Sequence, residues 1–532
     1  MKYPIGIQDF KSIRENGFVY VDKTDLLYKL VKGGKIYFLS RPRRFGKSLL
    51  VSTLKYYFSG VKDLFKGLAI ESLEKDWDTY PIFHIDFNGS DYTKSGAVLQ
   101  NLIKGTIEDW ERQYGYAGNA EYDHGKRFAE LMKFVHRLTG KPCVVLIDEY
   151  DKPLLDVIDS GLADVSTNGK ERLIEDANRE TLKGFYSTFK AADQDLRFVL
   201  LTGVTKFSQV SVFSGFNQPE DISMSAQYDA ICGITEDELE NVFHDEIDQM
   251  ADEMEVSSEE MRVMLKRHYD GYHFSKKKTD IFNPFSLLSA LNSKDIDDYW
   301  FRTGTPTYLV RLLNHTNENL NELTGRYYDT SEFIDYKADV ERPLPMIYQS
   351  GYLTIKDYDR LSNSYLLDLP NNEVKKGFLT LIASNYLGSR ESAGTLVIKL
   401  VRAIHRGDLE TWRKSLTAFF ASIPYSMRRK GDENEKERYF HYTFYLIFRI
   451  LSTYVTFTEL QQSEGRADCV IETEKGVYIF EFNLDGTAAE ALQQIEEKGY
   501  ARSYMSDNRK ICKVGVSFSS KTGTIDDWSM AE

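Results

Sequence analysis

The chain has 532 residues, of which 42% are hydrophobic and 28% charged, and its formal net charge is −14. This length exceeds what one hydrophobic core supports and predicts about three domains. The acidic balance excludes a protein coated with basic surface for nucleic acid, but it leaves a local basic groove open, because electrostatic footprints are local.

The sequence predicts a cytoplasmic protein with no membrane partner. No segment approaches the roughly 20 apolar residues that cross a bilayer, and the start "MKYPIGIQDF" lacks the pattern of a secretion signal. The cysteines form no Cys-x-x-Cys pair, which fits reduced core residues and argues against a structural zinc. They are Cys143, Cys232, Cys469 and Cys512.

The first part of the chain alternates short apolar runs with helical stretches. The runs cover residues 35–40, 80–87, 142–150 and 196–204, and "SLLVSTLKYYF" between the first two has helical spacing. Nearly continuous apolar strands of this kind are covered on both faces. They predict a parallel sheet flanked by helices, which is an α/β arrangement.

The remainder divides into two further predicted domains. After this first α/β domain, which covers residues 1–235, we expect a mainly helical lid over residues 236–375. Short strands within residues 344–359 and 364–374 predict a wing-like hairpin at its end. Residues 376–532 begin with helices and form a final α/β domain.

The stretch "SRPRRFGKSLL" lies between a buried strand and a helix, the context that a phosphate-binding loop requires. It predicts that residues 1–235 form a P-loop NTPase domain. Gly46 lets the main chain approach phosphates. Lys47 would contact the β- and γ-phosphates of ATP, and Ser48 would ligate Mg²⁺ where helix N–H groups favour anions. One position departs from the usual pattern, because Arg41 stands where the loop's first glycine would fall.

A second element supports nucleotide binding and hydrolysis. "VVLIDEYD" is an apolar strand that ends in acids, with Asp148 placed to hold Mg²⁺ and Glu149 to orient the attacking water. The alternative is a chance pairing of a basic turn with an acidic strand end. "LLTGVTKFS" could also place Thr202 or Thr205 near the γ-phosphate as a polar sensor.

Three arginines make the loop strongly cationic: Arg41, Arg43 and Arg44. We expect Arg43 and Arg44 to contact the nucleotide. One of the three could act as an arginine finger, in its own subunit or toward a neighbour in a homo-oligomer. The alternative is that they pair with acids and shape the loop.

Near the end of the chain, "GRADCVIETEKGVYIFEFNLDG" predicts a hairpin that turns at "TEKG". With Glu472 opposite Val477, the register pairs Asp468 with Glu481 on one face. Like charges so placed repel. Either both acids extend into water, or a divalent cation such as Mg²⁺ or Mn²⁺ lies between them.

The surroundings of this hairpin favour a metal site. Glu459 lies just upstream as a third carboxylate. Downstream, "TAAE" is a capping box that opens a helix, and Gln494 and Lys498 lie four residues apart on one face of it. Two strands and a helix with acids at the strand ends have the outline of a nuclease core.

The whole chain resembles the bacterial proteins that join an AAA-ATPase-like domain to a C-terminal PD-(D/E)XK nuclease-like domain. The resemblance is carried by "PIGIQDFKSIRENGFVYVDKTDLL", "FLSRPRRFGKSLLVSTLKYYF", "VVLIDEYDKPL", "TGVTKFS", "YDGYHF", "NPFSLL", "YQSGYLTI", "LPNNEV" and the stretch from "GRADCV" to "EEKGYA". Arginine at the position of Arg41 is a trait of that family.

The resemblance implies a restriction-endonuclease-like fold, nucleic acid as the partner, and Asp468 and Glu481 as metal-binding acids. Glu459 and Gln494 would support them. The departure is Asn483, which stands where the family has lysine. Losing that charge costs about a hundredfold in rate, unless Arg466 or Lys498 replaces it. An NTPase switch, or a nucleic-acid-binding protein with a degenerate nuclease domain, is the alternative. A scaffold with a structural nucleotide is a third hypothesis.

Overall fold

The computed structural model describes residues 1–165, 171–206, 219–303, 323–334, 343–387, 390–422, 456–458, 461–462, 465–466, 469–473, 475–504, 509–519, 521–522 and 524–532. These residues group into an N-terminal unit, Met1–Glu373, and a C-terminal unit, Val374–Glu532. The further division between residues 235 and 236 stays a prediction.

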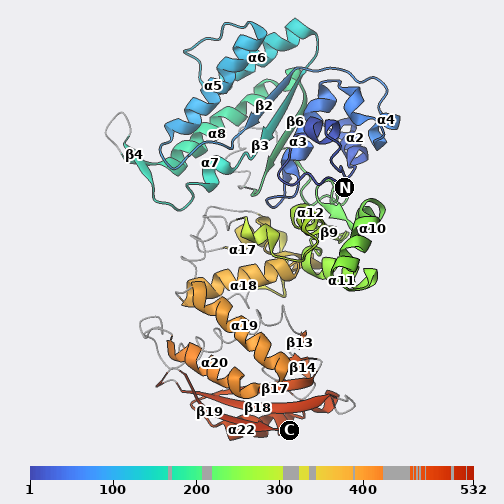
Figure 1. Ribbon diagram of the computed structural model, residues 1–532. Coiled ribbons are helices and arrows are strands. Elements are labelled where there is room, and N and C mark those ends of the chain that lie inside the picture. Colours follow the sequence, from blue (N-terminus) through green and yellow to red (C-terminus); the bar gives the residue numbers. More distant parts are fainter. Residues whose placement is uncertain are drawn as a thin grey trace. The chain divides into compact units, whose positions relative to one another are not determined.

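The N-terminal unit is built on a five-stranded parallel sheet with the order β2-β3-β6-β1-β7 (Figure 1). Its strands are β1 (Ile36–Ser40), β2 (Ile82–Asp86), β3 (Cys143–Asp148), β6 (Leu196–Gly203) and β7 (Glu220–Asp221). Every residue of β3 is buried, as expected for a strand covered on both faces. Because β6 lies between β1 and β3, the carboxyl ends of these three strands meet at one edge.

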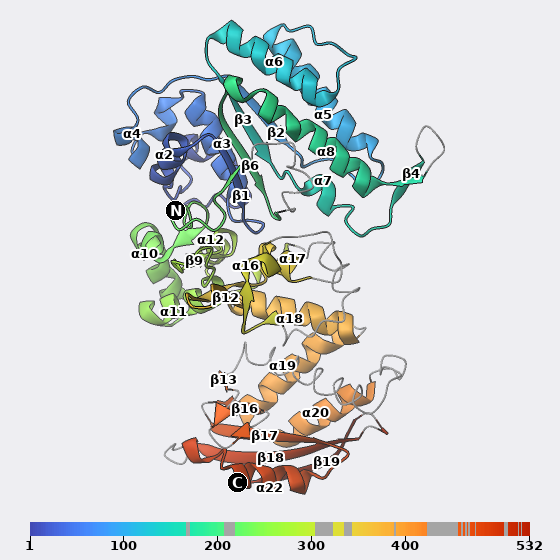
Figure 2. The same ribbon diagram turned by 180° about the vertical axis from the view of Figure 1, so that it is seen from behind.

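Helices cover both faces of this sheet (Figures 1 and 2). One layer contains α5 (Ala97–Tyr114), α6 (His124–Thr139) and α8 (Ile174–Ala191). The other contains α1 (Phe10–Glu15), α2 (Thr24–Gly33), α3 (Lys47–Phe58) and α4 (Ala69–Leu73). Shorter elements connect them: η1 (Lys62–Phe65), α7 (Lys152–Leu155), η2 (Asp193–Asp195) and the pair β4 (Ala163–Val165) and β5 (Glu171–Leu173). The predicted α/β sheet is therefore confirmed.

The lid, residues 236–373, begins with helices that share one core. They are α10 (Glu236–Glu253), α11 (Ser258–Tyr269) and α12 (Pro284–Ser293), joined by β8 (Ile234–Thr235), β9 (Ile281–Phe282) and α13 (Tyr299–Arg302). Capping boxes start α10 at Thr235 and α11 at Ser257. Each box supplies reciprocal partners for main-chain N–H groups, which explains these sharp helix starts.

The expected hairpin at the end of the lid is present and is part of a three-stranded sheet, β10-β12-β11. Its strands are β10 (Arg326–Asp329), β11 (Thr354–Asp359) and β12 (Ser364–Asp368), with α16 (Thr330–Phe333) after the first. Leu344–Gln349 forms the helix α17 instead of a strand. Pro345 lies in its first turn, where a fixed φ favours a helix start.

The described part of the C-terminal unit begins with helices, which are followed by a mixed sheet with the order β13-β16-β17-β18-β19. The helices are α18 (Asn372–Leu387, whose first two residues belong to the N-terminal unit), α19 (Arg390–Arg406) and α20 (Leu409–Ser422). The strands are β13 (Thr456–Thr458), β16 (Cys469–Glu472), β17 (Gly476–Leu484), β18 (Lys510–Ser519) and β19 (Thr524–Ala531). Additional elements are β14 (Gln461–Gln462), β15 (Gly465–Arg466), α22 (Ala488–Lys498) and η3 (Arg502–Tyr504).

The two faces of this second sheet have different covers. On one face, Val470 and Ile479 form a buried cluster with Ile495 of α22. On the other, the ring of Trp412 from α20 stacks on Phe480, with 4.8 Å between ring centroids. The parallel pair β17 and β18 is joined through α22. This is a helix–sheet–helix arrangement with a β-α-β crossover.

None of the described helices is long and apolar enough to cross a membrane. All four cysteines are buried and free.

Candidate functional site

The loop between β1 and α3 has the shape of an anion-binding turn. Gly46 has φ 93° and is the N-cap of α3, with no side-chain hydrogen bond to the first turn. A side chain at this φ is strained, although a Cβ there would meet nothing within 4 Å. The first N–H groups of α3 therefore lack a side-chain cap and suit an anion such as phosphate.

Lys47 is buried at the start of α3, and its ammonium group lies among oxygen atoms. Its Nζ donates to the carbonyl oxygens of Arg41 and Pro42, at 3.1 Å and 3.3 Å. It also lies 3.7 Å from Oε1 of Glu149. The side chain is 4% exposed. The structure thus brings the loop lysine and the strand-end glutamate together, although they are about a hundred residues apart in the sequence.

Asp148 ends β3 and is fixed by a neighbouring strand. Its Oδ1 accepts a hydrogen bond from the hydroxyl of Thr202 in β6, at 2.6 Å, and another from the main-chain N–H of Glu149, at 3.1 Å. Thr202 is fully buried. Its hydroxyl therefore orients the acid, and its predicted role as a γ-phosphate sensor stays a prediction.

Glu149 has φ 51°, an uncommon conformation for a residue with a side chain. Strain of this kind persists where surrounding contacts fix the main chain, and it is frequent at functional sites. Here the conformation turns the chain directly after β3. Ser48 lies in the first turn of α3 and is half-buried. Its role as a Mg²⁺ ligand stays a prediction.

Two acids that the sequence interpretation missed lie beside Asp148. Asp86 ends β2 and is its register partner; burial and the charge of Asp148 raise the pKa of Asp86. Asp151 is fully buried and accepts hydrogen bonds from the N–H and hydroxyl of Thr205, at 2.6 Å and 2.7 Å. Burial and Glu149 raise the pKa of Asp151. The acidic end of "FHID" was the available signal for Asp86.

Arg41 is buried and makes its contacts within its own chain. It is 1% exposed, and its guanidinium donates to main-chain carbonyls, including that of Ser223 at 2.7 Å. The group also lies over the ring of Phe274, 4.1 Å from the centroid. Burial lowers the pKa of Arg41. Arg41 thus bonds to main-chain carbonyls, whereas the alternative hypothesis named acids as its partners. A role as an arginine finger stays a prediction.

The other two arginines of the loop also contact the lid, Arg43 through its main chain and Arg44 through its side chain. The carbonyl oxygen of Arg43 accepts a hydrogen bond from the indole N–H of Trp300, at 3.0 Å. Arg44 is exposed, has φ 69°, and its guanidinium lies 4.6 Å from the ring centroid of Phe285. Their predicted contacts with the nucleotide stay predictions.

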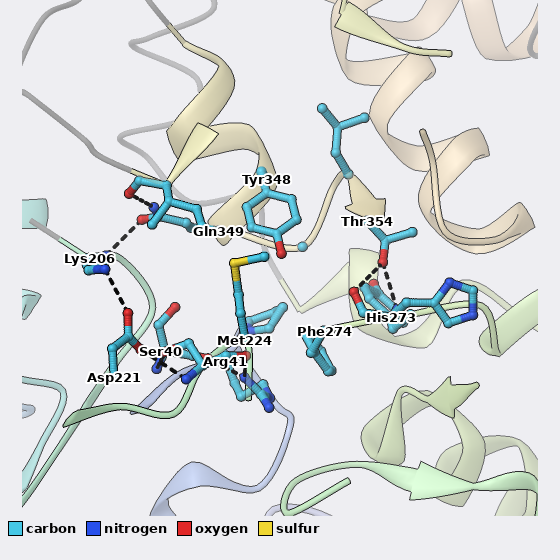
Figure 3. A pocket seen from close by; sticks show the side chains of 16 residues that line it. Ser40, Arg41, Lys206, Asp221, Met224, His273, Phe274, Tyr348, Gln349 and Thr354 are labelled. Atoms are coloured by element: carbon cyan, nitrogen blue, oxygen red, sulfur yellow. Dashed lines mark hydrogen bonds and ion pairs between the residues drawn. The ribbon is translucent and has the colours of Figure 1, made fainter. Parts of the chain in front are cut away.

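A small cavity lies beside the start of the loop (Figure 3). Lys206, directly after β6, pairs with Asp221 at 2.7 Å, and its main-chain N–H donates to Gln349 of the lid at 2.8 Å. Tyr348, Met224 and other apolar side chains line the space. The cavity thus lies between the sheet edge and the lid.

In the C-terminal unit the predicted hairpin register is confirmed, with Glu472 opposite Val477 and Cys469 opposite Phe480. Glu481 continues β17 and is 3% exposed. Asp468 and Glu459 lie outside the described residues. That Asp468 and Glu481 lie opposite each other across the ladder therefore stays a prediction.

Glu481 lies next to the place where α22 crosses the sheet. Its register partner in β18 is Gly515, where a Cβ would come within 2.1 Å of the Ala488 carbonyl oxygen. The capping box predicted for this helix is confirmed. Gln494 and Lys498 are exposed on α22, and their catalytic roles stay predictions.

Asn483, which replaces the motif lysine, stabilises the turn that leads into α22. Its side-chain amide donates to the carbonyl oxygen of Thr487, at 3.3 Å. Ser517, its register partner, donates to the Gly486 carbonyl at 2.8 Å. Arg466 pairs with Gln461 in a separate two-stranded ladder. The described ladder with β17 starts only at Cys469, so the pairing of Arg466 with Asn483 is not seen.

Within the described parts of the chain, no group of three or more His, Cys, Asp or Glu side chains is arranged to hold a metal ion. At the first site, Asp148 and Ser48 offer hard oxygen donors, the ligand type that Mg²⁺ prefers. Residues present there therefore fit a magnesium–nucleotide complex. At the predicted metal site of the C-terminal unit, Glu481 is described, but Asp468 lies outside the described residues.

Two solved structures from Aeropyrum pernix and one from Pyrobaculum aerophilum show a distant likeness. The A. pernix ORC2 protein, in ADPNP–ADP complexes, is 13% identical with a TM-score of 0.27, and 68% of this chain and 92% of that chain are covered. The P. aerophilum Cdc6p is 13% identical with a TM-score of 0.22, and 70% of this chain and 93% of that chain are covered. The A. pernix ORC1 protein, in complex with DNA, is 10% identical with a TM-score of 0.21, and 66% of this chain and 89% of that chain are covered.

Sequence comparisons are more specific. A family model described as a predicted AAA-ATPase, AAA-ATPase-like, matches residues 4–213. A model of the PD-(D/E)XK nuclease superfamily matches residues 435–528. An uncharacterized protein in the vnfD 5′ region of Azotobacter chroococcum mcd 1 is 35% identical over 529 residues, which cover 97% of this chain and 96% of that protein. The chain belongs to the AAA-ATPase-like family, in the form that carries a C-terminal domain of the PD-(D/E)XK nuclease superfamily.

Proposed function

We propose that this protein binds ATP with Mg²⁺ at the carboxyl edge of the first sheet and hydrolyses it. The observation that carries the proposal is the convergence of Lys47, Asp148 and Glu149 at that edge, with 3.7 Å between the ammonium and the glutamate. Lys47 is buried and Glu149 is half-buried. Buried or partly buried charge pairs of this kind are frequent at functional sites, and this one borders the loop where a triphosphate would bind. Mg²⁺, when bound, would offset charge on the phosphates.

Each residue has a proposed task. The N–H groups after Gly46 and the ammonium of Lys47 hold the phosphates. Asp148, oriented by Thr202, and Ser48 hold the metal ion. Glu149 positions the attacking water and receives its proton.

ATP turnover in Mg²⁺ tests this assignment. Wild-type protein should hydrolyse ATP, and Lys47→Ala should abolish turnover because the phosphate-binding cation is lost. Lys55→Ala is the matched control, since Lys55 is an exposed lysine of the same helix. A wild-type rate no higher than that of Lys47→Ala would contradict the proposal.

We further propose that the C-terminal unit acts on nucleic acid, DNA or RNA, with weakened cleavage. Support comes from the family match and from the buried Glu481 beside α22. Weak activity is expected in Mn²⁺, and Glu481→Ala should remove it.

The second candidate is an NTPase switch whose nuclease-like domain only binds nucleic acid. The hydrogen bond from Asn483 to Thr487 favours this candidate, because the motif position has acquired a structural partner. If high concentrations of protein leave single- and double-stranded DNA and RNA intact, the second candidate is correct.

A further inference from the structure

The phosphate-binding loop contacts the lid through successive residues. The guanidinium of Arg41 lies over Phe274. The ring of Phe45 packs edge-on against Tyr272, with 4.8 Å between centroids. These contacts come from "YDGYHF", a stretch that the proposed chemistry leaves unused. The loop is therefore held from the lid side as well as by β1 and α3.

Trp300 makes the most specific of these contacts. Its indole N–H donates to the carbonyl oxygen of Arg43, at 3.0 Å. Its main-chain N–H donates to Oε1 of Glu373, at 2.6 Å. The ring packs against Tyr352, with 5.3 Å between centroids, and the residue is 6% exposed. One buried residue thus bonds to the loop and to Glu373 at once.

Glu373 is fixed in turn. It is 1% exposed, and its second oxygen, Oε2, accepts the hydroxyl of Ser286 at 2.7 Å. It is the second residue of α18, whose residues from Val374 onward belong to the C-terminal unit. The carboxyl group of Glu373 therefore connects Trp300 to the first turn of that helix.

We propose that Trp300 is a positioning residue of the phosphate-binding loop, and that it ties the main chain of the loop to the start of α18. The proposal rests on the proposed nucleotide site, since it assigns Trp300 a role in holding the loop of that site. It adds a route by which the state of the loop and the state of this helix start influence each other.

The peptide geometry explains how one hydrogen bond can have this effect. A trans peptide is planar, and its C=O and N–H groups point in opposite directions. Holding the Arg43 carbonyl toward Trp300 therefore fixes the direction of the Arg44 N–H. Arg44 has φ 69°, a conformation that surrounding contacts must maintain. Successive N–H groups near left-handed residues form concave anion sites.

The cavity of Figure 3 lies on the same boundary between loop and lid. Its walls include Arg41 and Pro42 of the loop, and Phe274 and Gly351 of the lid. The boundary is close-packed beside the cavity, because a Cβ at Gly351 would come within 2.7 Å of the Pro42 side chain. The loop and the lid therefore touch at Pro42 as well as at Trp300.

Hydrogen exchange of the whole protein tests the proposal without nucleotide. Trp300→Phe keeps an aromatic ring against Tyr352 and removes the indole donor together with part of the ring volume, a loss of volume that the control below shares. We expect peptides covering residues 41–48 to exchange about fivefold faster, the effect of one neutral hydrogen bond. Trp110→Phe is the control, because Trp110 is similarly buried in α5, at 7% exposure, and should leave those peptides unchanged.

A second variant tests the link to α18. Glu373→Ala removes the acceptor of the Trp300 main chain and should also speed exchange of residues 41–48. Glu111→Ala, which removes another buried glutamate, with 5% exposure, should not. Unchanged exchange at residues 41–48 in Trp300→Phe would overturn the role of Trp300, and unchanged exchange in Glu373→Ala would overturn the link.

ATP kinetics separate this proposal from the proposed function. Trp300→Phe should raise KM for ATP about fivefold with little change in kcat, because a loop that binds phosphates contributes equally to ground and transition states. A fall in kcat with unchanged KM would contradict loop positioning. If the wild-type protein fails to bind ATP, the proposed function is wrong, and the exchange experiment still decides the role of Trp300.

Discussion

The ammonium of Lys47 lies 3.7 Å from the carboxylate of Glu149, so the lysine proposed to bind phosphate and the proposed catalytic base are paired with each other. Two carbonyl oxygens of the loop also accept hydrogen bonds from this ammonium. A triphosphate must compete with these partners for Lys47. Binding of the phosphates would then free Glu149 to position water, which links nucleotide binding to preparation of the base.

Thr202→Val should raise the Mg²⁺ requirement of the ATPase. The hydroxyl of Thr202 donates to Asp148 at 2.6 Å, and valine keeps the shape while it removes the donor. Loss of a partner that orients a metal ligand weakens metal affinity by roughly tenfold or more. A Mg²⁺ titration of ATP turnover measures this. Thr106→Val, which removes a hydroxyl bonded to a helix carbonyl in α5, should leave the titration unchanged, and an unshifted curve for Thr202→Val would contradict the assignment.

Glu373→Gln should reduce the pH dependence of stability. Burial raises the pKa of Glu373 from 4.5 to about 8, and the charge of Asp298 adds to the effect. The folded state then holds a proton that the unfolded state has released. Stability from this group is full below its unfolded pKa and is lost as pH rises toward about 8, by up to about 1.4 kcal/mol per pH unit.

Thermal unfolding between pH 5 and pH 9 measures this effect. The melting temperature of wild type should fall more over this range than that of Glu373→Gln, because glutamine does not ionise. Burial also raises the pKa of Asp270, to about 7, but Asp270 is present in both proteins. If the melting temperatures of wild type and Glu373→Gln fell equally with pH, ionisation of Glu373 would not be the cause of the pH dependence.

Gly515→Ala should destabilise the protein. An added Cβ would lie 2.1 Å from the Ala488 carbonyl oxygen and 2.9 Å from the Leu492 nitrogen, so α22 would have to move off the sheet. Overpacking of this kind costs about 3 kcal/mol. Gly105→Ala in α5, where a Cβ meets nothing within 4 Å, should instead stabilise by about 0.5–1 kcal/mol. Equal melting temperatures for the two variants would contradict the packing at Gly515.

Asn483→Lys should increase cleavage of DNA or RNA in Mn²⁺ by about a hundredfold, because a cation is restored beside the scissile phosphate. The same change removes the hydrogen bond to Thr487 and should cost about 1 kcal/mol of stability. Cleavage assays and thermal unfolding measure the two effects. Adding Glu481→Ala should abolish the gained activity. No gain in the lysine variant would indicate that more than this charge is missing.

Local patterns allowed much of the fold to be predicted. The strand–loop–helix around Lys47, the acidic end of the strand at Asp148 and the hairpin register at Glu472 each depend on residues close in sequence. Apolar runs, a glycine with its neighbouring lysine and serine, and strand alternation report such elements directly. The fold class and the family that these signals predicted were confirmed by the structure and by the sequence comparisons.

The contacts that hold the site could not be predicted in the same way. Trp300 and Arg43 are 257 residues apart, and Arg41 finds its carbonyl partner in Ser223, 182 residues away. Main-chain carbonyls are present at every residue, so the sequence does not indicate which one a buried arginine or indole will reach. Asp151 was missed for the same reason, because its partner Thr205 is set by the neighbouring strand.

Binding and turnover of ATP by Glu149→Gln test the central claim most directly. Glutamine keeps the size of the side chain but cannot take a proton, and it releases the ion pair with Lys47. We predict that the variant binds ATP in Mg²⁺ at least as tightly as wild type and turns it over about a hundredfold more slowly, the usual contribution of a positioned base. Turnover at the wild-type rate would contradict the assignment of the first sheet edge as the hydrolytic site.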